Sequence, residues 1–169
     1  MRRLVQIILQ QYRLSELGIH GVAHWGRVLE NGRRLAPLTR ADLRVVELFA
    51  ILHDACRAND GADPEHGPRA AALARSWRRW IDLEDANFAL LLEACDCHTR
   101  GPRPEMDVTV HTCLDADRLD IPRVGMQIRP VLLFTSAARD RVMISWAGRR
   151  GARRETPPVC AEEWGWRQR

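Results

Sequence analysis

The stretch Val45-Val46-Glu47-Leu48-Phe49-Ala50-Ile51-Leu52-His53-Asp54 decides much of this protein's fold. Seven of its first eight residues are apolar, which predicts a helix that is buried on most of its faces. The stretch then ends in a histidine followed by an aspartate. A carboxylate in apolar surroundings is costly unless it is paired or bound to a metal. Either the last turn of this helix reaches the surface, or the pair has partners elsewhere in the chain.

Helical periodicity also dominates on both sides of this stretch. Gly18 should break the first helix, Pro37 should end the second, Thr39 should cap the third, and Asp107 should cap the sixth. Asp82 is the candidate cap of the fifth. Helices are predicted over residues 4–17, 20–35, 40–53, 68–80, 83–98, 108–119 and 131–146, with loops at 57–67 and 99–106. Because no stretch alternates with a period of two, we expect an all-α fold.

The length of 169 residues fits one domain with a substantial core. All 26 basic residues are arginines, and they are balanced by acids over residues 1–138. Residues 139–169 hold 8 arginines against 4 acids, which accounts for the net charge of +4. We therefore expect a helical domain over residues 1–138, followed by a helix end and a partly flexible Arg-rich tail. Contact of this tail with nucleic acid is the less favoured alternative, because the tail lacks interleaved aromatic residues.

No apolar run approaches the roughly eighteen residues of a membrane span, so no membrane partner is expected. Residues 1–11 fit an amphipathic helix better than a signal peptide, since glutamines interrupt the apolar part, and we expect a cytoplasmic location. The cysteines show no paired spacing and should be free, mostly buried thiols. The five are Cys56, Cys95, Cys97, Cys113 and Cys160.

Polar residues recur at matching places on the predicted helices. His24 lies on the second, His53-Asp54 ends the third, and Asp115-Ala116-Asp117-Arg118-Leu119-Asp120 lies on the sixth. This ordered set, together with His66-Gly67, resembles the HD-domain metal-dependent phosphohydrolase superfamily over roughly residues 15 to 125. The resemblance implies a helical metal-binding domain and a phosphohydrolase activity.

The resemblance further implies that His24, His53, Asp54 and Asp117 are metal ligands. Two imidazoles and two carboxylates suit a divalent ion such as Mn, Fe, Ni, Co or Zn, and mixed nitrogen and oxygen sites also hold Mg. Such an ion would polarise a phosphoryl oxygen and supply a metal-bound hydroxide to attack phosphorus.

The aspartates of the sixth helix need to be told apart. The resemblance selects Asp117, which directly precedes Arg-Leu, and Asp115 is the alternative ligand. Asp120 lies on the same helical face as Asp117, which makes it a candidate second-shell partner.

The remaining histidines leave the number of metals open. His66 and His98 are candidate ligands of a second ion, although the one-metal set is complete without them. His20 could line the same pocket or could simply be a satisfied polar residue at a helix start. His111 is expected to be a core or surface residue.

A phosphate substrate needs countercharge, which arginine supplies through two parallel hydrogen bonds. Arg57, one turn after Asp54, is the preferred candidate, ahead of Arg27 and Arg118. The resemblance implies that the general acid for the leaving group lies on the loop after His53-Asp54, where members of the superfamily carry acidic residues. Asp60 is favoured there over Asp63 and Glu65. The predicted catalytic residues are therefore Asp54, Arg57 and Asp60.

These observations predict a metal-dependent hydrolase that cleaves a phosphoester of a nucleotide or small phosphorylated metabolite. The alternatives are a non-catalytic metal-binding regulatory module and a nucleic-acid-associated module of the same fold. The sequence does not decide the substrate, the metal or whether the chain forms a homo-oligomer.

Overall fold

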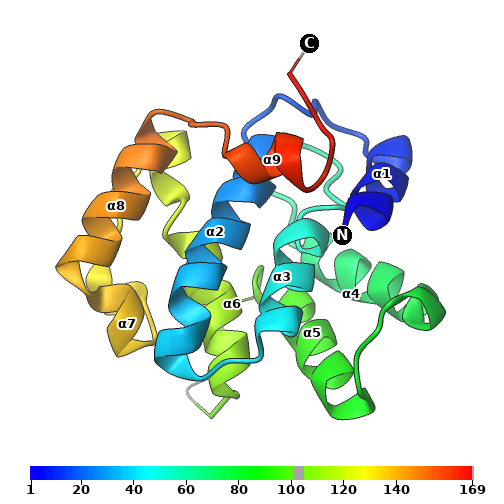
Figure 1. Ribbon diagram of the computed structural model, residues 1–169, viewed down its shortest axis with the longest axis horizontal. Helices are drawn as coiled ribbons and strands as arrows, with labels where there is room; N and C mark the ends of the chain where they lie inside the picture. Colours follow the sequence, from blue (N-terminus) through cyan, green and yellow to red (C-terminus); the bar gives the residue numbers. More distant parts are fainter. Residues whose placement is uncertain (101–104, 169) are drawn as a thin grey trace.

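The computed structural model describes residues 1–100 and 105–168, and the regular elements in these ranges are all helical (Figure 1). The predicted all-α fold is therefore confirmed. The elements are α1 (Arg2–Gln11), α2 (Val22–Thr39), α3 (Leu43–Leu52), α4 (His66–Ser76), η1 (Arg78–Trp80), α5 (Asp85–Cys97), α6 (Val108–Arg118), η2 (Ile121–Val124), η3 (Pro130–Leu132), α7 (Ser136–Arg139), α8 (Arg141–Ala152) and α9 (Pro158–Glu162).

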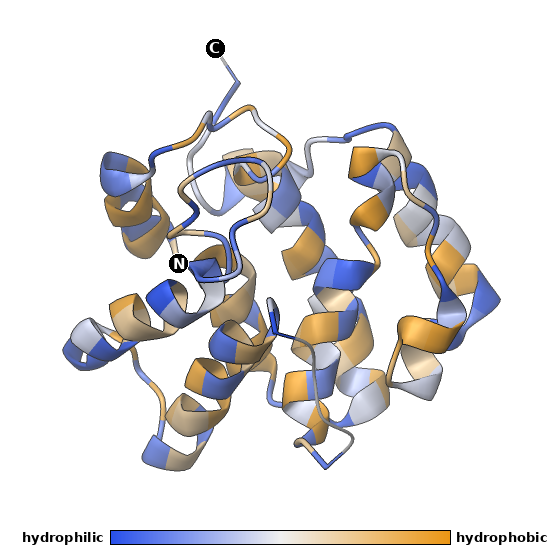
Figure 2. Cartoon of the chain, turned by 180° about the vertical axis from the view of Figure 1, so that it is seen from behind, coloured by the Kyte–Doolittle hydropathy of each residue, from blue (hydrophilic) through white to orange (hydrophobic). Residues whose placement is uncertain are grey.

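Helix α3 lies at the centre of the bundle because nearly all of its side chains are apolar. It packs against α2, α5 and α6, and its residues from Leu48 to Leu52 are fully buried. Helix α4 covers α5, and α8 packs on α2 and η2. The other long helices carry both hydrophobic and hydrophilic bands, as expected for helices with one buried face (Figure 2). The apolar run that begins at Val45 therefore becomes the core of the domain.

The first predicted helix is too long. Helix α1 ends at Gln11, where the backbone of Tyr12 turns to an extended conformation. Residues 12–21 form an irregular loop, in which the Tyr12 hydroxyl donates to the carbonyl of His20 at 2.7 Å. The periodicity had predicted that His20 begins the second helix. Because α2 begins only at Val22, His20 belongs to the preceding loop instead.

The predicted junction between the second and third helices is also wrong. Helix α2 continues through Pro37 to Thr39, and the Thr39 hydroxyl donates back to the Leu35 carbonyl of its own helix at 3.2 Å. Asp42 caps α3 instead, with its carboxylate accepting from the amide of Val45 at 2.8 Å. A threonine hydroxyl can donate to a carbonyl one turn earlier in its own helix. Thr39 does so here, and it therefore does not cap α3.

Other boundaries shift by a few residues. Helix α4 begins at His66, and Glu84 rather than Asp82 precedes α5. The predicted cap at Asp107 is confirmed, since its side chain accepts from the amide of Thr109 at 2.7 Å. The single helix predicted over residues 131–146 is instead divided into η3, α7 and the start of α8, because Asp140 breaks the run and caps α8.

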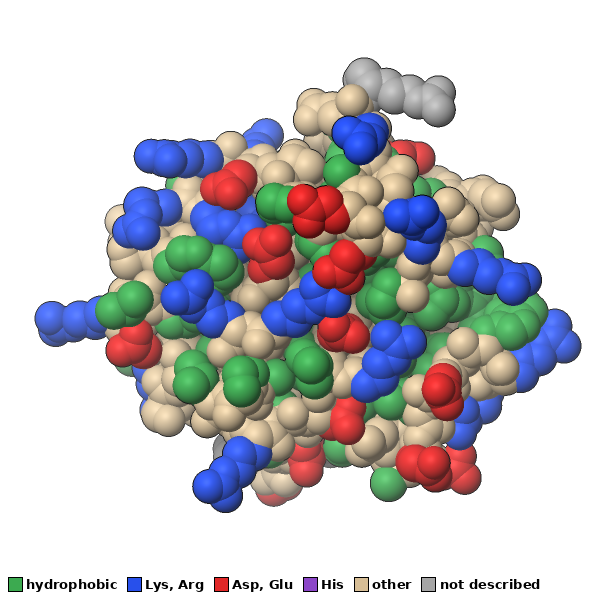
Figure 3. Space-filling view, in the orientation of Figure 1, with side chains coloured by type: hydrophobic (Ala, Val, Ile, Leu, Met, Phe, Trp, Pro, Cys, Tyr) green, Lys and Arg blue, Asp and Glu red, His purple; other side chains and the backbone are tan. Residues whose placement is uncertain are grey.

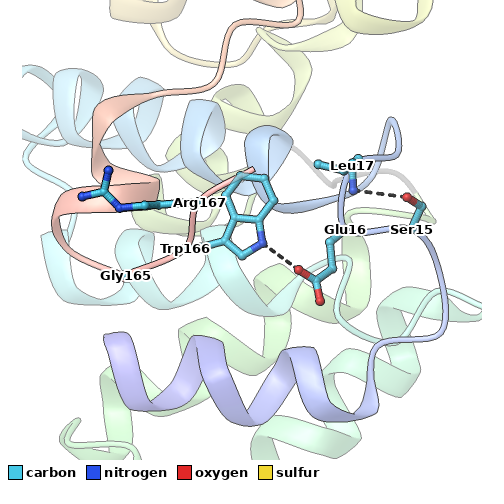
Figure 4. A pocket seen from close by; sticks show the side chains of 6 residues that line it. All are labelled: Ser15, Glu16, Leu17, Gly165, Trp166 and Arg167. Atoms are coloured by element: carbon cyan, nitrogen blue, oxygen red, sulfur yellow. Dashed lines mark hydrogen bonds between the residues drawn. The ribbon is translucent and has the colours of Figure 1, made fainter. Parts of the chain in front are cut away.

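The C-terminal segment is packed on the bundle. We expected a partly flexible Arg-rich tail, but residues 141–162 include α8 and α9, and Trp164 is only 1% exposed. Gly26 on α2 permits this contact, because a Cβ there would lie 2.6 Å from the Cys160 sulfur. Trp166 then reaches the loop before α2 and donates to Glu16 at 2.6 Å (Figure 4). Burial of apolar residues spaced along the segment therefore holds it on the bundle despite its many charged side chains. The predicted boundary at residue 138, between a helical domain and a separate C-terminal segment, stays a prediction.

Acidic and basic side chains are interleaved on the face that Figure 3 shows. No helix in residues 1–100 or 105–168 is both long and apolar enough to cross a membrane.

Candidate metal centre

The ends of five helices bring the polar residues together. His24 lies in the first turn of α2, His53 and Asp54 follow α3, and Asp117 lies in the last turn of α6. His66 begins α4, and His98 directly follows α5. The side chains of His24, His53 and Asp54 are at most 3% exposed, whereas that of Asp117 is 22% exposed. The cluster is thus deeply set, with one carboxylate opening towards solvent.

The first group of donors consists of His24, His53 and Asp117, joined by one oxygen of Asp54. Nε2 of His24 lies 3.4 Å from Oδ1 of Asp117 and 3.4 Å from Oδ2 of Asp54. Nε2 of His53 lies 3.8 Å and 3.6 Å from the same two oxygens. The structure therefore brings together all four residues that the resemblance implied as ligands.

A second group lies on the other side of Asp54. Its Oδ1 is 3.0 Å from Nε2 of His66 and 3.8 Å from Nε2 of His98. Each group of three, one with Asp117 and one with Asp54, has its ligand atoms within 4.8 Å of one another. Asp54 thus presents one oxygen to each group, which is the arrangement of a bridging carboxylate. His66 and His98 were only optional candidates on the sequence.

Close helix packing holds the second group together. Gly67, next to His66, lies against the end of α5, and a Cβ there would be 2.6 Å from the Cys95 carbonyl oxygen. Only glycine permits this approach of α4 to α5. Cys95 and Cys97, which precede His98 in the chain, are buried thiols, as predicted.

The tautomers of the four histidines follow from the partners of their Nδ1 atoms. Nδ1 of His53 lies 3.1 Å from the Ala50 carbonyl, that of His98 lies 2.7 Å from the Cys95 carbonyl, and that of His66 contacts the Asp63 carbonyl. Since a carbonyl accepts, each of these Nδ1 atoms carries the proton. Nδ1 of His24 lies 2.7 Å from Oδ2 of Asp120 and donates in the same way. In its neutral form, a ring with this tautomer presents the lone pair of Nε2 to the cluster.

These Nε2 atoms face each other in pairs. The pair from His24 and His53 is separated by 3.1 Å, and the pair from His66 and His98 by 2.8 Å. Two lone pairs at such distances repel unless a proton or a cation lies between them. A divalent cation bound between the two Nε2 atoms of a pair would remove this repulsion. The donor set therefore fits one divalent ion in each group.

The electrostatics favour the protonation states that bind metals. Burial lowers the pKa of His53 to about 3, so its ring is neutral at pH 7. Burial raises the pKa values of Asp117 and Asp54, but the charge and hydrogen bonds of the surrounding histidines, in their protonated form, lower them by more. The pKa of Asp117 is lowered to about 2, and that of Asp54 lies well below its usual range. Neutral imidazoles and ionised carboxylates are the metal-binding forms.

Among solved structures, the chain is similar to the crystal structure of a predicted HD superfamily hydrolase from an uncultured Thermotogales bacterium, determined at 1.45 Å. The two share 26% sequence identity with a TM-score of 0.68, and the match covers 87% of this chain and 84% of that chain. The chain has the fold of the HD superfamily. No protein-family model and no curated protein matches the sequence. The likeness and the two donor groups support an HD-type function in general terms.

Around this HD-fold cluster, Asp120 orients His24. Its Oδ2 accepts from His24, and both of its oxygens accept from Arg27, at 2.7 and 3.0 Å. Asp120 therefore contacts His24, one of the predicted ligands, and lies outside both donor groups. Asp115 lies apart from both groups, because its carboxylate accepts from the amides of Phe134 and Thr135 at 2.8 Å. Its role is to hold the chain that follows η3.

Arg57 is the arginine that reaches the donor groups. Its Nε and Nη2 donate to the carbonyls of Asn59 and Gly61, which fix the side chain. Its Nη1 lies 3.5 Å from Oδ1 of Asp54 and 3.1 Å from Nε2 of His66. The guanidinium therefore faces the second group of donors with one nitrogen and is anchored by the other two.

The other candidate residues have different roles. Arg27 is occupied by Asp120, and Arg118 stacks on the Phe134 ring. His111 also stacks on Phe134, at a centroid distance of 4.7 Å, as expected for a residue outside the site. Glu65 is exposed and lies 3.5 Å from Arg100.

The loop after Asp54 carries the two remaining acids. Asp60 lies 2.8 Å from Nδ1 of His20, so His20 contacts the site region through this loop. Asp63 pairs with Arg69 at 2.6 Å and accepts from the amide of Ala58 at 2.8 Å, which is a structural role. Asp60 therefore makes fewer structural contacts than Asp63 and is the better candidate for a catalytic role.

The donor groups open into a cavity of about 460 Å³. Its walls include Asp54, Asp117 and Arg57, together with Thr99 and Arg123. The last two were missed from the sequence. Arg123 follows Asp120 by three residues, but nothing in that spacing distinguishes it from other arginines. Burial raises the pKa of Asp117, whereas His53, His24 and, more weakly, the positive charge of Arg123 lower it.

Proposed function

We propose that the protein is a metal-dependent phosphohydrolase that cleaves a phosphoester of a nucleotide or small phosphorylated metabolite. The observation that carries this proposal is the convergence of four histidine Nε2 atoms on the two oxygens of Asp54. Within each group, two of these Nε2 atoms lie about 3 Å apart, a spacing at which two neutral rings repel unless a cation lies between them. Because all four predicted ligands are present and close together, the cluster also argues against a non-catalytic module.

The ligand assignment follows from the two donor groups. His24, His53, Asp117 and Oδ2 of Asp54 would hold one ion, and His66, His98 and Oδ1 of Asp54 would hold a second. A divalent ion bound there would lower the pKa of a water molecule and polarise a phosphoryl oxygen. Asp120 keeps the His24 ring in the tautomer and orientation that binding requires.

The protein's own cations would bind the phosphate. Arg57 faces the cavity with Nη1, and Arg123 lines the same cavity next to Asp117. Their guanidinium groups would neutralise phosphate oxygens and orient the phosphorus atom for in-line attack. Asp60, held by His20, is the proposed proton donor to the leaving group. A cavity of about 460 Å³ suits a small substrate.

Metal content is the first test of this proposal. The purified protein is analysed for divalent metals, with Asp54→Asn as the test variant and Asp96→Asn as a matched control. Asp96 lies on α5, is half-exposed and belongs to neither donor group. We expect about two metal equivalents in the wild type and the control, and a loss of most metal from the Asp54 variant.

A phosphoester screen with the bound metal then tests catalysis. Hydrolysis of a phosphomonoester or nucleotide by the wild type, lost in Asp54→Asn but kept in Asp96→Asn, supports the proposal. A wild-type protein that takes up no divalent metal contradicts it. So does a metal-loaded protein that releases no phosphate from any substrate in the panel.

A further inference from the structure

Two arginines beside the metal centre are held by backbone carbonyls rather than by acids. Nε of Arg123 donates to the Ile19 carbonyl at 2.8 Å, and its Nη1 donates to the Asp120 carbonyl at 3.2 Å. Nε of Arg154 in turn donates to the Arg123 carbonyl at 3.0 Å. These bonds orient both guanidinium groups without cancelling their charge.

The acids in this region are already engaged. Asp120, 3.9 Å from Arg123, has both oxygens occupied by the shorter bonds from Arg27 and His24. Within the described residues, no carboxylate pairs with the Arg154 guanidinium. Glu155, its neighbour in sequence, is directed to Arg150 at 3.7 Å. The region therefore carries excess positive charge, and two partly unused arginine head groups are available.

A separate cavity lies at these arginines. It has a volume of about 170 Å³, and its walls include Arg27, Arg123 and Arg154 together with Thr156 and Trp166. Because one water molecule takes about 30 Å³, the space suits one small oxyanion and a few waters. Arg123 lines both this cavity and the larger one at the metal ligands. The two cavities are thus adjacent and share a cationic wall.

We propose that Arg123 and Arg154 form an anion subsite that binds a second phosphate or carboxylate group of the substrate. The assignment to a substrate rests on the proposed function, whereas anion binding at the two arginines does not. The substrate class is then narrowed to phosphoesters that carry another anionic group, such as a nucleotide with a further phosphate. Arginine suits this role because its planar head group can donate two parallel hydrogen bonds to an oxyanion.

Neighbouring positions in the chain offer a matched test. Arg154→Gln removes one positive charge from the subsite, and Arg153→Gln removes the same charge one residue earlier, outside the cavity walls. Both side chains are exposed, so both variants should fold. Binding of inorganic phosphate to the purified proteins, both as isolated and after metal loading, is measured by isothermal titration calorimetry at low ionic strength.

Loss of one charge-assisted hydrogen bond should raise the phosphate Kd of Arg154→Gln about tenfold, while Arg153→Gln stays within about twofold of the wild type. Equal Kd values for the two variants overturn the subsite, as does a wild type that binds no phosphate. The titration requires no turnover. A protein that lacks hydrolase activity can therefore still show the subsite, and an active enzyme can lack it.

Discussion

Asp120→Ala should be one of the most damaging single substitutions in the chain. The Asp120 carboxylate is 1% exposed and accepts three hydrogen bonds: from Nε of Arg27 at 2.7 Å, from Nη2 of Arg27 at 3.0 Å, and from His24 at 2.7 Å. The Arg27 side chain is itself only 3% exposed. Removing the carboxylate leaves a buried guanidinium without a counter-charge and His24 without its orienting acceptor.

The size of the effect follows from this burial. Breaking a buried ion pair by removing one partner costs about 3–5 kcal/mol, because the remaining charge stays desolvated. Replacing both partners by apolar residues, as in Arg27→Met with Asp120→Leu, should therefore be less destabilising than Asp120→Ala alone. Loss of the second-shell acceptor should also weaken metal binding about 10- to 100-fold in any variant that still folds.

Urea denaturation followed by circular dichroism measures the stability change. Glu163→Ala is the control, because Glu163 makes a similar two-point contact with Arg33 at the surface and is 41% exposed. We expect this control to lose no more than about 1 kcal/mol. An Asp120→Ala variant that loses no more than the control, or a double variant less stable than the single one, would refute the reasoning.

Three further predictions concern packing and the thiols. Gly67→Ala should destabilise the fold and lower the metal content, because its Cβ would meet a backbone oxygen at 2.6 Å; unchanged metal content would contradict this. Trp164→Ala should destabilise the protein by about 3–5 kcal/mol in urea denaturation, whereas Trp80→Ala, at a side chain that is 48% exposed, should cost far less; equal losses would show that Trp164 does not anchor the C-terminal segment. At pH 8, iodoacetamide should label the half-buried Cys56 first. Burial raises the pKa of Cys113 well above its ordinary value and keeps it a thiol, so labelling of Cys113 as fast as Cys56 in the native protein would be inconsistent with the core.

Much of the candidate site could be predicted from local sequence. His53-Asp54 stands out because two polar residues end an apolar helix, and the ordered pieces around His24 and Asp117 resemble the HD superfamily. The structure brings these four residues together, and the solved relative confirms the resemblance in fold. Their metal-binding role remains a proposal.

Other parts of the site could not be predicted because they depend on contacts between distant segments. His66 and His98 are 32 residues apart, and their Nε2 atoms meet only because Gly67 allows α4 to approach α5. Arg123 lines two cavities because the loop that carries Ile19 folds over η2. The spacing of residues in the sequence does not indicate which distant segments come into contact.

Taken alone, the sequence determined that the protein is all-α and placed most of its helices within a few residues; its resemblance to the HD superfamily singled out His24, His53, Asp54 and Asp117. Periodic burial and short motifs carry that information, since both act between residues close in the chain. The tertiary structure alone decided that Asp54 serves two donor groups, and that the Arg-rich C-terminal segment is packed on the bundle around Trp164. Both outcomes depend on which helix faces meet, and that is decided by the packing of the whole core.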